Sequence, residues 1–172
     1  SIPCNGAAAV IISKDKTDIE ISGSGISTNK LTAFEREDMT SWNSTINAAK
    51  IAYKQSGITA EDISIAEIHD AFTSVELISY EDLGFAKKGE GKELIRKGIT
   101  KINGTLPVNT SGGLKAKGHP ISATGISQIY ELVLQLRKQA KKRQVDNIKY
   151  ALAHNIGGAG CVTAVHILKK VM

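Results

Sequence analysis

The chain has 172 residues, of which 41% are hydrophobic and 23% charged, a balance typical of a globular protein with one well-buried core. The formal net charge is +5, but aromatic residues make up only 5% of the chain, which argues against the stacking platforms of single-strand nucleic-acid binders. No apolar run approaches the roughly 20 residues of a membrane-spanning helix, and no leader pattern opens the chain, so we expect neither a nucleic-acid partner nor a membrane association.

The first part of the chain contains two strand patterns and one helix pattern. The apolar run 7–13 (AAAVIIS) predicts a buried strand, and 18–24 (DIEISGS) predicts a half-buried one that runs antiparallel to it if the two are neighbours. The chain starts without methionine and enters the first run almost at once, so we expect it to be part of a longer protein. Residues 38–57 predict a helix that ends at Gly57. Its buried face is expected to consist of Met39, Trp42, Ile46, Ala49 and Tyr53.

The middle of the chain predicts a strand that leads directly into a helix. Residues 63–68 form the strand pattern, and HDAF follows at 69–72. Helical spacing then continues to Gly84, and glycines bound a short helix at 89–98. The helical spacing after the strand is set by Phe72, Val75, Ser79 and Leu83.

The last part begins with a glycine-rich loop, NTSGGLKAKGHP, at 109–120. A long helix is expected from Ile121 to about Arg143, and strand patterns at 150–155 and 162–168 form a hairpin. The buried face of the long helix is expected to contain Ile126, Ile129, Tyr130, Val133 and Leu136. The order of elements predicts a single layered α/β/α domain over residues 1–172, with a mixed sheet of about five strands.

The basic run and the cysteines favour simple interpretations. The cations of 137–143 (RKQAKKR) suit a helix end, where they complement the dipole, better than a nucleic-acid patch. Cys4 and Cys161 lie in no metal-ligand spacing, and we expect them to be reduced in a cytoplasmic protein.

Three segments place polar residues at the ends of predicted elements beside small residues. They are His69-Asp70-Ala71-Phe72, Gly118-His119-Pro120 and His154-Asn155-Ile156-Gly157. Strand ends of this kind bind ligands in α/β sheets. Each segment also has a structural interpretation: Asp70 as a helix N-cap, His119 as a turn residue, and the glycines near 157 as a hairpin turn. A metal site built from His69, Asp70, His119 and His154 has no supporting ligand spacing, and we expect none.

Taken together, these segments resemble the thiolase family. GGLKAKGHPISATG at 112–125 is similar to the thiolase GG…GHP signature, and HDAF is similar to the HDxF block of sterol-carrier-type and archaeal thiolases. NIGGAG at 155–160 resembles the closing CxGGG block, and NGAAAV at 5–10 resembles the start of the C-terminal half. The proline after His119 favours thiolases over ketoacyl synthases, and the order of blocks agrees over essentially the whole chain.

The resemblance implies an acyl-CoA site that is shared between two similar domains. The N-terminal domain, which we expect as a partner of this chain, would supply an acylated cysteine, and the assembly would be a homo-oligomer. His119 would activate that cysteine and hold a thioester oxygen, while His69 would position a water or an oxyanion donor. The substrate would be a coenzyme A thioester, with no cofactor. Substrate contacts are expected from Gly118, Gly157, Ser111 and Phe72.

The acid–base cysteine of the family is missing from both of its familiar positions. An ungapped match puts Asn155 at the first of them, which places Asn155 with the catalytic positions, and Ala71 stands at the second. The sequence therefore leaves two functions open. One is the C-terminal half of an acetyl-CoA C-acetyltransferase-like enzyme for thioester Claisen condensation or cleavage, inactive as an isolated chain. The other is a non-catalytic protein of this fold that binds acyl-CoA or lipid or acts as a scaffold.

Overall fold

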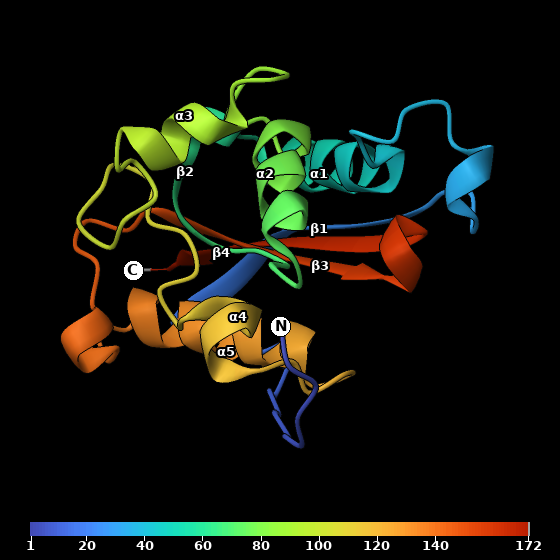
Figure 1. Ribbon diagram of the computed structural model, residues 1–172. Coiled ribbons are helices and arrows are strands. Elements are labelled where there is room, and N and C mark those ends of the chain that lie inside the picture. The colour runs from blue at the N-terminus through green and yellow to red at the C-terminus, as the bar shows by residue number, and fades with distance from the viewer. Residues whose placement is uncertain (172) are drawn as a thin grey trace.

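A four-stranded mixed sheet forms the centre of the computed structural model, which describes residues 1–171 (Figure 1). Its strands are β1 (Ile19–Thr28), β2 (Ile63–Glu67), β3 (Tyr150–Gly157) and β4 (Val162–Lys170). The order across the sheet is β1-β4-β3-β2, and only β2 and β3 run parallel. Helices lie on both sides of the sheet, so the predicted α/β/α layering is confirmed.

The helices divide into two layers, as Figure 1 shows. One layer holds α1 (Asn43–Ser56), α2 (Thr73–Asp82) and α3 (Gly91–Arg96), and the other holds α4 (Gly113–Lys117) and α5 (Thr124–Leu136). Short 3-10 helices occur at Ala33–Glu35, Ala60–Asp62, Lys141–Arg143 and Gly158–Gly160. No helix of the described part of the chain is long and apolar enough to cross a lipid bilayer.

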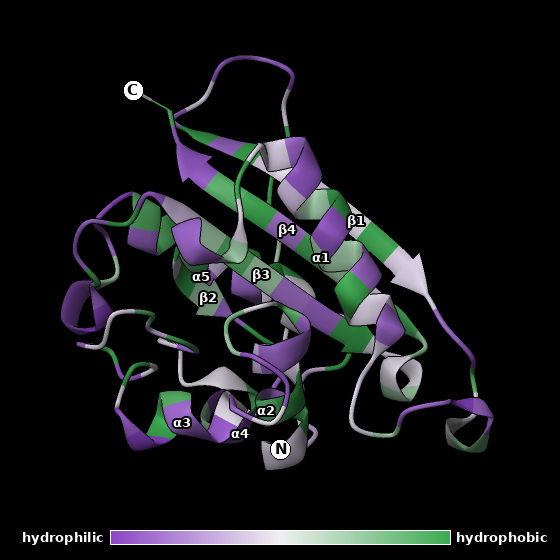
Figure 2. Ribbon diagram, turned by 90° about the horizontal axis from the view of Figure 1, so that it is seen from above, coloured by the Kyte–Doolittle hydropathy of each residue, from purple (hydrophilic) through white to green (hydrophobic). Residues whose placement is uncertain are grey.

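Two hydrophobic clusters hold the layers to the sheet, one on each face. Leu152 and Ile167 belong to the cluster with α1 and α2, whereas Ala151, Ala153 and Leu168 belong to the cluster with α5. Successive side chains of a strand point to opposite faces, which explains this alternation. Figure 2 shows hydrophobic and hydrophilic stretches along β3 and β4, whose two faces are both covered.

Helix α1 packs close to β1, and its buried face shares Ala49 with the predicted one, while Trp42 is buried just before the helix. A Cβ atom at Gly23 or Gly25 would lie 2.2 or 2.1 Å from a carbonyl oxygen of α1. Only small side chains fit so near the strand, and the buried residues of α1 are Ser44, Thr45, Ala48, Ala49 and Ala52. The prediction that Met39 belongs to this face was wrong, since the helix begins at Asn43 and Met39 is 60% exposed. The predicted end at Gly57 is confirmed by its left-handed φ of 68°.

The predicted strand at 7–13 does not form. Its side chains are largely exposed, with Ile11 at 99% and Ile12 at 76%. An apolar run forms a strand only where a neighbour satisfies its backbone N–H and C=O groups, and β1 pairs instead with β4. A single parallel bridge between Ala66 and Val108 lies beyond β2. The sheet thus has four strands rather than about five.

The glycine loop and the following helix also differ from the prediction. The loop contains the one-turn helix α4, and α5 covers 124–136 rather than 121–143. Tyr130, predicted as buried, is 55% exposed. The buried face of α5 is partly polar, because neighbouring loops supply hydrogen-bond partners; it contains Thr124, Gln128, Ile129, Glu131, Leu132, Gln135 and Leu136.

Candidate functional site

A cavity of about 840 Å³ lies where the carboxyl ends of β2 and β3 meet the first turns of α2 and α5. His69, His119 and Asn155, which come from the three segments singled out in the sequence, all line it. Parallel neighbours such as β2 and β3 place their carboxyl ends at one edge of the sheet, and this topology brings the segments together. Phe72, which is 68% exposed, and Gly157 also line the cavity.

Two of the imidazoles that line the cavity, those of His69 and His119, face each other edge to face. Their ring centroids are 5.2 Å apart, and the ring planes make an angle of 87°. His119 Nδ1 lies 2.7 Å from Thr124 Oγ1, and the Thr124 hydroxyl donates to the Pro120 carbonyl at 3.1 Å. Since that hydroxyl has only one proton, it accepts from His119 Nδ1–H. Nε2 of neutral His119 is therefore the nitrogen with a free lone pair.

His69 is the more deeply buried of the two rings, with 7% of its surface exposed. Burial, with a smaller contribution from His119, lowers the pKa of His69 to about 4. The ring is consequently neutral at physiological pH. It can donate or accept a hydrogen bond without adding charge to the cavity.

Asn155 lies between His69 and a residue that the sequence did not reveal. Its Nδ2 atom is 3.3 Å from His69 Nδ1 and 3.3 Å from Gln128 Oε1. Gly125 of α5 lies next to this side chain, since a Cβ atom there would be 3.4 Å from Asn155 Cγ, an ordinary van der Waals contact. The available sequence signal for Gln128 was its position one helical turn after Thr124 and one residue before the predicted core residue Ile129.

Asp70 caps a helix, although not the helix that local sequence suggested. α2 begins after Phe72 without a side-chain cap. The Asp70 carboxylate instead accepts from the backbone N–H groups of Leu114 at 2.6 Å and Lys115 at 3.4 Å, in α4. This contact ties the HDAF block to the glycine block and thereby fixes the distance between His69 and His119.

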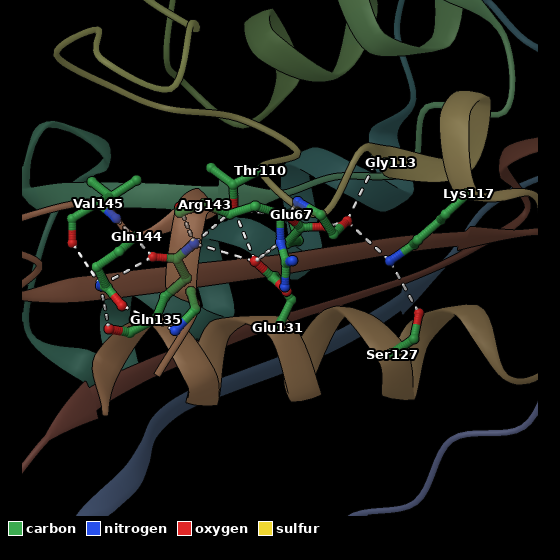
Figure 3. Close-up of polar contacts among 12 residues, drawn as sticks. Glu67, Thr110, Gly113, Lys117, Ser127, Glu131, Gln135, Arg143, Gln144 and Val145 are labelled. Carbon is green, nitrogen blue, oxygen red and sulfur yellow. Dashed lines mark hydrogen bonds and ion pairs between the residues drawn. The ribbon is translucent and has the colours of Figure 1, made fainter. Parts of the chain in front are cut away.

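Ser111 lies outside the residues that line the cavity and belongs to a polar network that includes Glu67 and Lys117, two residues labelled in Figure 3. Its backbone N–H donates to Glu67 Oε1 at 2.9 Å, and its hydroxyl donates to the same carboxylate. Lys117 Nζ donates to Ser111 Oγ at 3.0 Å and to Ser127 Oγ at 3.3 Å. Burial raises the pKa of Glu67, while the contacts with Ser111 oppose that change. Ser111 thus holds the glycine loop to the end of β2.

Gly118 and the two cysteines also stand apart from the cavity lining. Gly118 has a left-handed φ of 87°, and a Cβ atom there would lie 2.6 Å from Cys4 Sγ. Cys4 is exposed, and Cys161 Sγ lies 3.7 Å from the Gly157 carbonyl in the closing turn. Neither thiol is among the residues that line the cavity.

Among the described residues, no three His, Cys, Asp or Glu side chains gather as a metal ion requires. Of the four residues considered for a metal site, Asp70 is bound to α4, and His154 faces α1 on the other side of the sheet. His154 is fully buried, and its Nε2 lies 3.2 Å from Thr45 Oγ1. Burial, with a smaller contribution from His69, lowers the pKa of His154 to about 3.

We expect His154 to make folding sensitive to acid. The pKa of His154 in the folded chain lies below the unfolded value of about 6.5. As pH falls from 6.5 towards 3, His154 is therefore protonated in the unfolded chain but stays neutral in the folded chain. Stability should fall across this range by up to about 1.4 kcal/mol per pH unit from this group. Urea unfolding at several pH values should show that the free energy of unfolding depends less on pH in His154→Gln than in the wild type. Leu132→Val, a buried control, should lower stability equally at every pH. If His154→Gln also lowered stability by the same amount at every pH, the assignment to His154 would be contradicted.

The chain matches a known protein family over most of its length. Residues 25–170 match the family described as thiolase C-terminal domain-like. The chain is 43% identical over 96% of its length to acetyl-CoA acetyltransferase of Methanothermobacter thermautotrophicus, of which it covers 45%. It is 38% identical over 92% of its length to human sterol carrier protein 2, of which it covers 31%. The chain thus spans less than half the length of these relatives.

Solved structures show the same fold. The Ltp2-ChsH2(DUF35) aldolase matches 88% of the chain with a TM-score of 0.80 and 28% identity, over 39% of the matched chain. A monomeric SCP2-thiolase like protein type 1 from Mycobacterium smegmatis matches 90% of the chain, and 29% of its own, with a TM-score of 0.66 at 18% identity.

Proposed function

This chain belongs to the thiolase C-terminal domain-like family, and we propose that it supplies the acid–base and oxyanion groups of an acyl-CoA active site whose nucleophilic cysteine lies in a preceding domain. The observation that carries the proposal is the pair of facing imidazoles, 5.2 Å apart, at a cavity large enough for an acyl thioester. The reaction class is thioester Claisen condensation or cleavage, as the name of the archaeal relative suggests.

His119 has the properties of the base in this reaction. Its Nε2 lone pair accepts the thiol proton of the cysteine, and the thiolate attacks the thioester carbonyl. The proton passes to the departing sulfur of coenzyme A as the carbon–sulfur bond breaks. Thr124 holds the ring through Nδ1, so the basic nitrogen stays directed away from that contact.

Asn155 does not replace the missing acid–base cysteine, because an amide does not titrate. Removal of the α-proton therefore falls to His119 or to a group from the preceding domain. That domain would also cover exposed apolar side chains at the cavity, among them Met39 at 60%, Phe72 at 68% and Ile121 at 73%. We place the assembled protein, a homo-oligomer of two-domain chains, in the cytoplasm.

The alternative is a protein that binds acyl-CoA or lipid without chemistry. Asn155 and Ala71 favour it, since both stand where the family carries an acid–base cysteine. The apolar lining of the cavity also suits an acyl chain, and the similarity to sterol carrier protein 2 points the same way. This lining includes Val75, Ile78, Ile126 and Ile129.

Incubating the full-length protein with acetoacetyl-CoA and coenzyme A separates the two functions. The enzyme proposal expects cleavage to acetyl-CoA and an acylated cysteine peptide from the preceding domain in the mass spectrum. Acyl-CoA binding by calorimetry without turnover or acylation would leave only the alternative. The 172-residue chain alone should show no turnover, because neither of its cysteines lines the cavity. Saturable turnover of this chain that survives Cys4→Ala and Cys161→Ala would refute the missing-nucleophile assignment.

A further inference from the structure

The geometry assigns a role to Gln128: together with Asn155 it fixes His69 in the tautomer that carries its proton on Nε2, so that the ring presents a neutral N–H donor to the cavity. Gln128 is 1% exposed and lies on α5, one helical turn after Thr124. Its side chain hydrogen-bonds to Asn155 and to the His154 carbonyl, and in the described chain it makes no hydrogen bond to the His69 or His119 ring. Its influence passes through Asn155, so it is a positioning residue rather than a catalytic one.

The direction of the hydrogen bonds is set by a backbone carbonyl. Gln128 Nε2 lies 3.0 Å from the carbonyl oxygen of His154, which can only accept. The amide nitrogen of Gln128 therefore faces that carbonyl, and its Oε1 atom faces Asn155. The orientation of this buried amide is not free, because the opposite one would place two oxygen atoms in contact.

Asn155 must in turn present its amide nitrogen to Gln128. Nδ2 has two protons, and the two acceptors at 3.3 Å are Gln128 Oε1 and His69 Nδ1. Nδ1 of His69 consequently accepts and carries no proton. Because burial and the nearby His119 keep the ring neutral, its one N–H proton lies on Nε2. No carboxylate of the described chain hydrogen-bonds either nitrogen of this ring to oppose the arrangement.

The two histidines then have opposite tautomers, which explains why the site uses two. Thr124 accepts from Nδ1–H of His119 and leaves a lone pair on Nε2, whereas Asn155 donates to Nδ1 of His69 and leaves a proton on Nε2. One ring is a base and the other is a donor. The catalytic meaning rests on the proposed function: a neutral N–H donor stabilises the developing thioester oxyanion, and a lone pair at the same position would repel it.

The tautomer can be measured without substrate. Two-bond ¹H–¹⁵N correlation spectra of uniformly labelled full-length protein distinguish protonated from unprotonated ring nitrogens, and His69→Gln identifies the signals of His69. We expect protonated Nε2 and unprotonated Nδ1 in the wild type. Protonated Nδ1 in the wild type would overturn the proposal, and the His69→Gln variant serves only to assign the signals.

Two substitutions then test the relay. Asn155→Asp offers only acceptors, so a proton should move to Nδ1 of His69; Gln128→Leu releases the Asn155 amide and should give a mixture of tautomers. Thr45→Val is the control, because it removes the partner of His154 on the other face of the sheet and should leave His69 unchanged. Spectra of His69 that stay the same in both relay variants would refute the role of Gln128.

Activity separates this inference from the proposed function. In a full-length enzyme that turns over, Asn155→Asp should lower kcat by about 10²-fold, as expected for the loss of one oxyanion donor, with little change in acyl-CoA affinity. A flipped tautomer with unchanged kcat would show that the donor does not act in the reaction. The predicted tautomer in a protein without any turnover would instead reject only the proposed function.

Discussion

Replacing His119 with alanine in the full-length protein is expected to lower kcat by about 10²–10³-fold while acyl-CoA affinity changes little. Of the two facing imidazoles, that of His119 is the one with a lone pair on its free nitrogen, since its Nδ1–H is donated to Thr124. Under the proposed function, removing it takes away the proton acceptor of the cysteine. Ground-state binding relies on the rest of the cavity, which the substitution leaves in place.

Measuring kcat, acyl-CoA affinity and melting temperature on the same His119→Ala protein separates chemistry from folding. Thr124→Val provides a matched comparison, because it keeps the ring but removes the hydroxyl that orients it, and its kcat should fall less. If His119 were a structural residue of its loop, the variant would melt early and turn over normally per folded molecule. That outcome would end its assignment as the base.

The location of the site could be predicted from the sequence because it depends on local patterns. The sequence marked three element boundaries: His69 just after a strand, His119 in a loop, and Asn155 near the end of a strand. The sheet order brings these boundaries to one edge. The roles of the side chains depend on contacts between distant residues. Asp70 is a cap for a helix that begins 43 residues later, at Gly113, and the local sequence pointed only to its own helix.

The errors in the fold prediction have a related cause. Periodicity shows which side chains are apolar, but the neighbour decides which face is buried. Gly23 and Gly25 on β1 admit the small residues of α1 in place of its larger ones, and loop groups satisfy the polar face of α5. Run 7–13 has a strand pattern, yet β1 pairs with β4 and leaves it without a partner in the described chain.

The contact between Asp70 and the glycine loop predicts a large stability effect for Gly113→Ala. Gly113 has a left-handed φ of 61°, and a Cβ atom there would lie 2.3 Å from Asp70 Oδ2. Gly57 has a similar φ of 68° with no atom within 4 Å of the added carbon, so Gly57→Ala measures the backbone cost alone. We expect a loss of about 1–2 kcal/mol for Gly57→Ala. Gly113→Ala should lose about 1–3 kcal/mol more, because the carboxylate must leave its buried N–H partners.

A double-mutant cycle in urea unfolding tests where this extra loss originates. In an Asp70→Ala background the carboxylate is gone, so Gly113→Ala should cost about as much as Gly57→Ala. Asp70→Ala and Gly113→Ala, each alone, should also lower kcat in the full-length protein. Asp70 is adjacent to His69, and α4 leads directly to His119. Gly57→Ala, at the far end of α1, should leave kcat unchanged. Equal losses for the two glycine variants in the presence of Asp70 would show that the contact with Asp70 adds nothing to the backbone cost at Gly113.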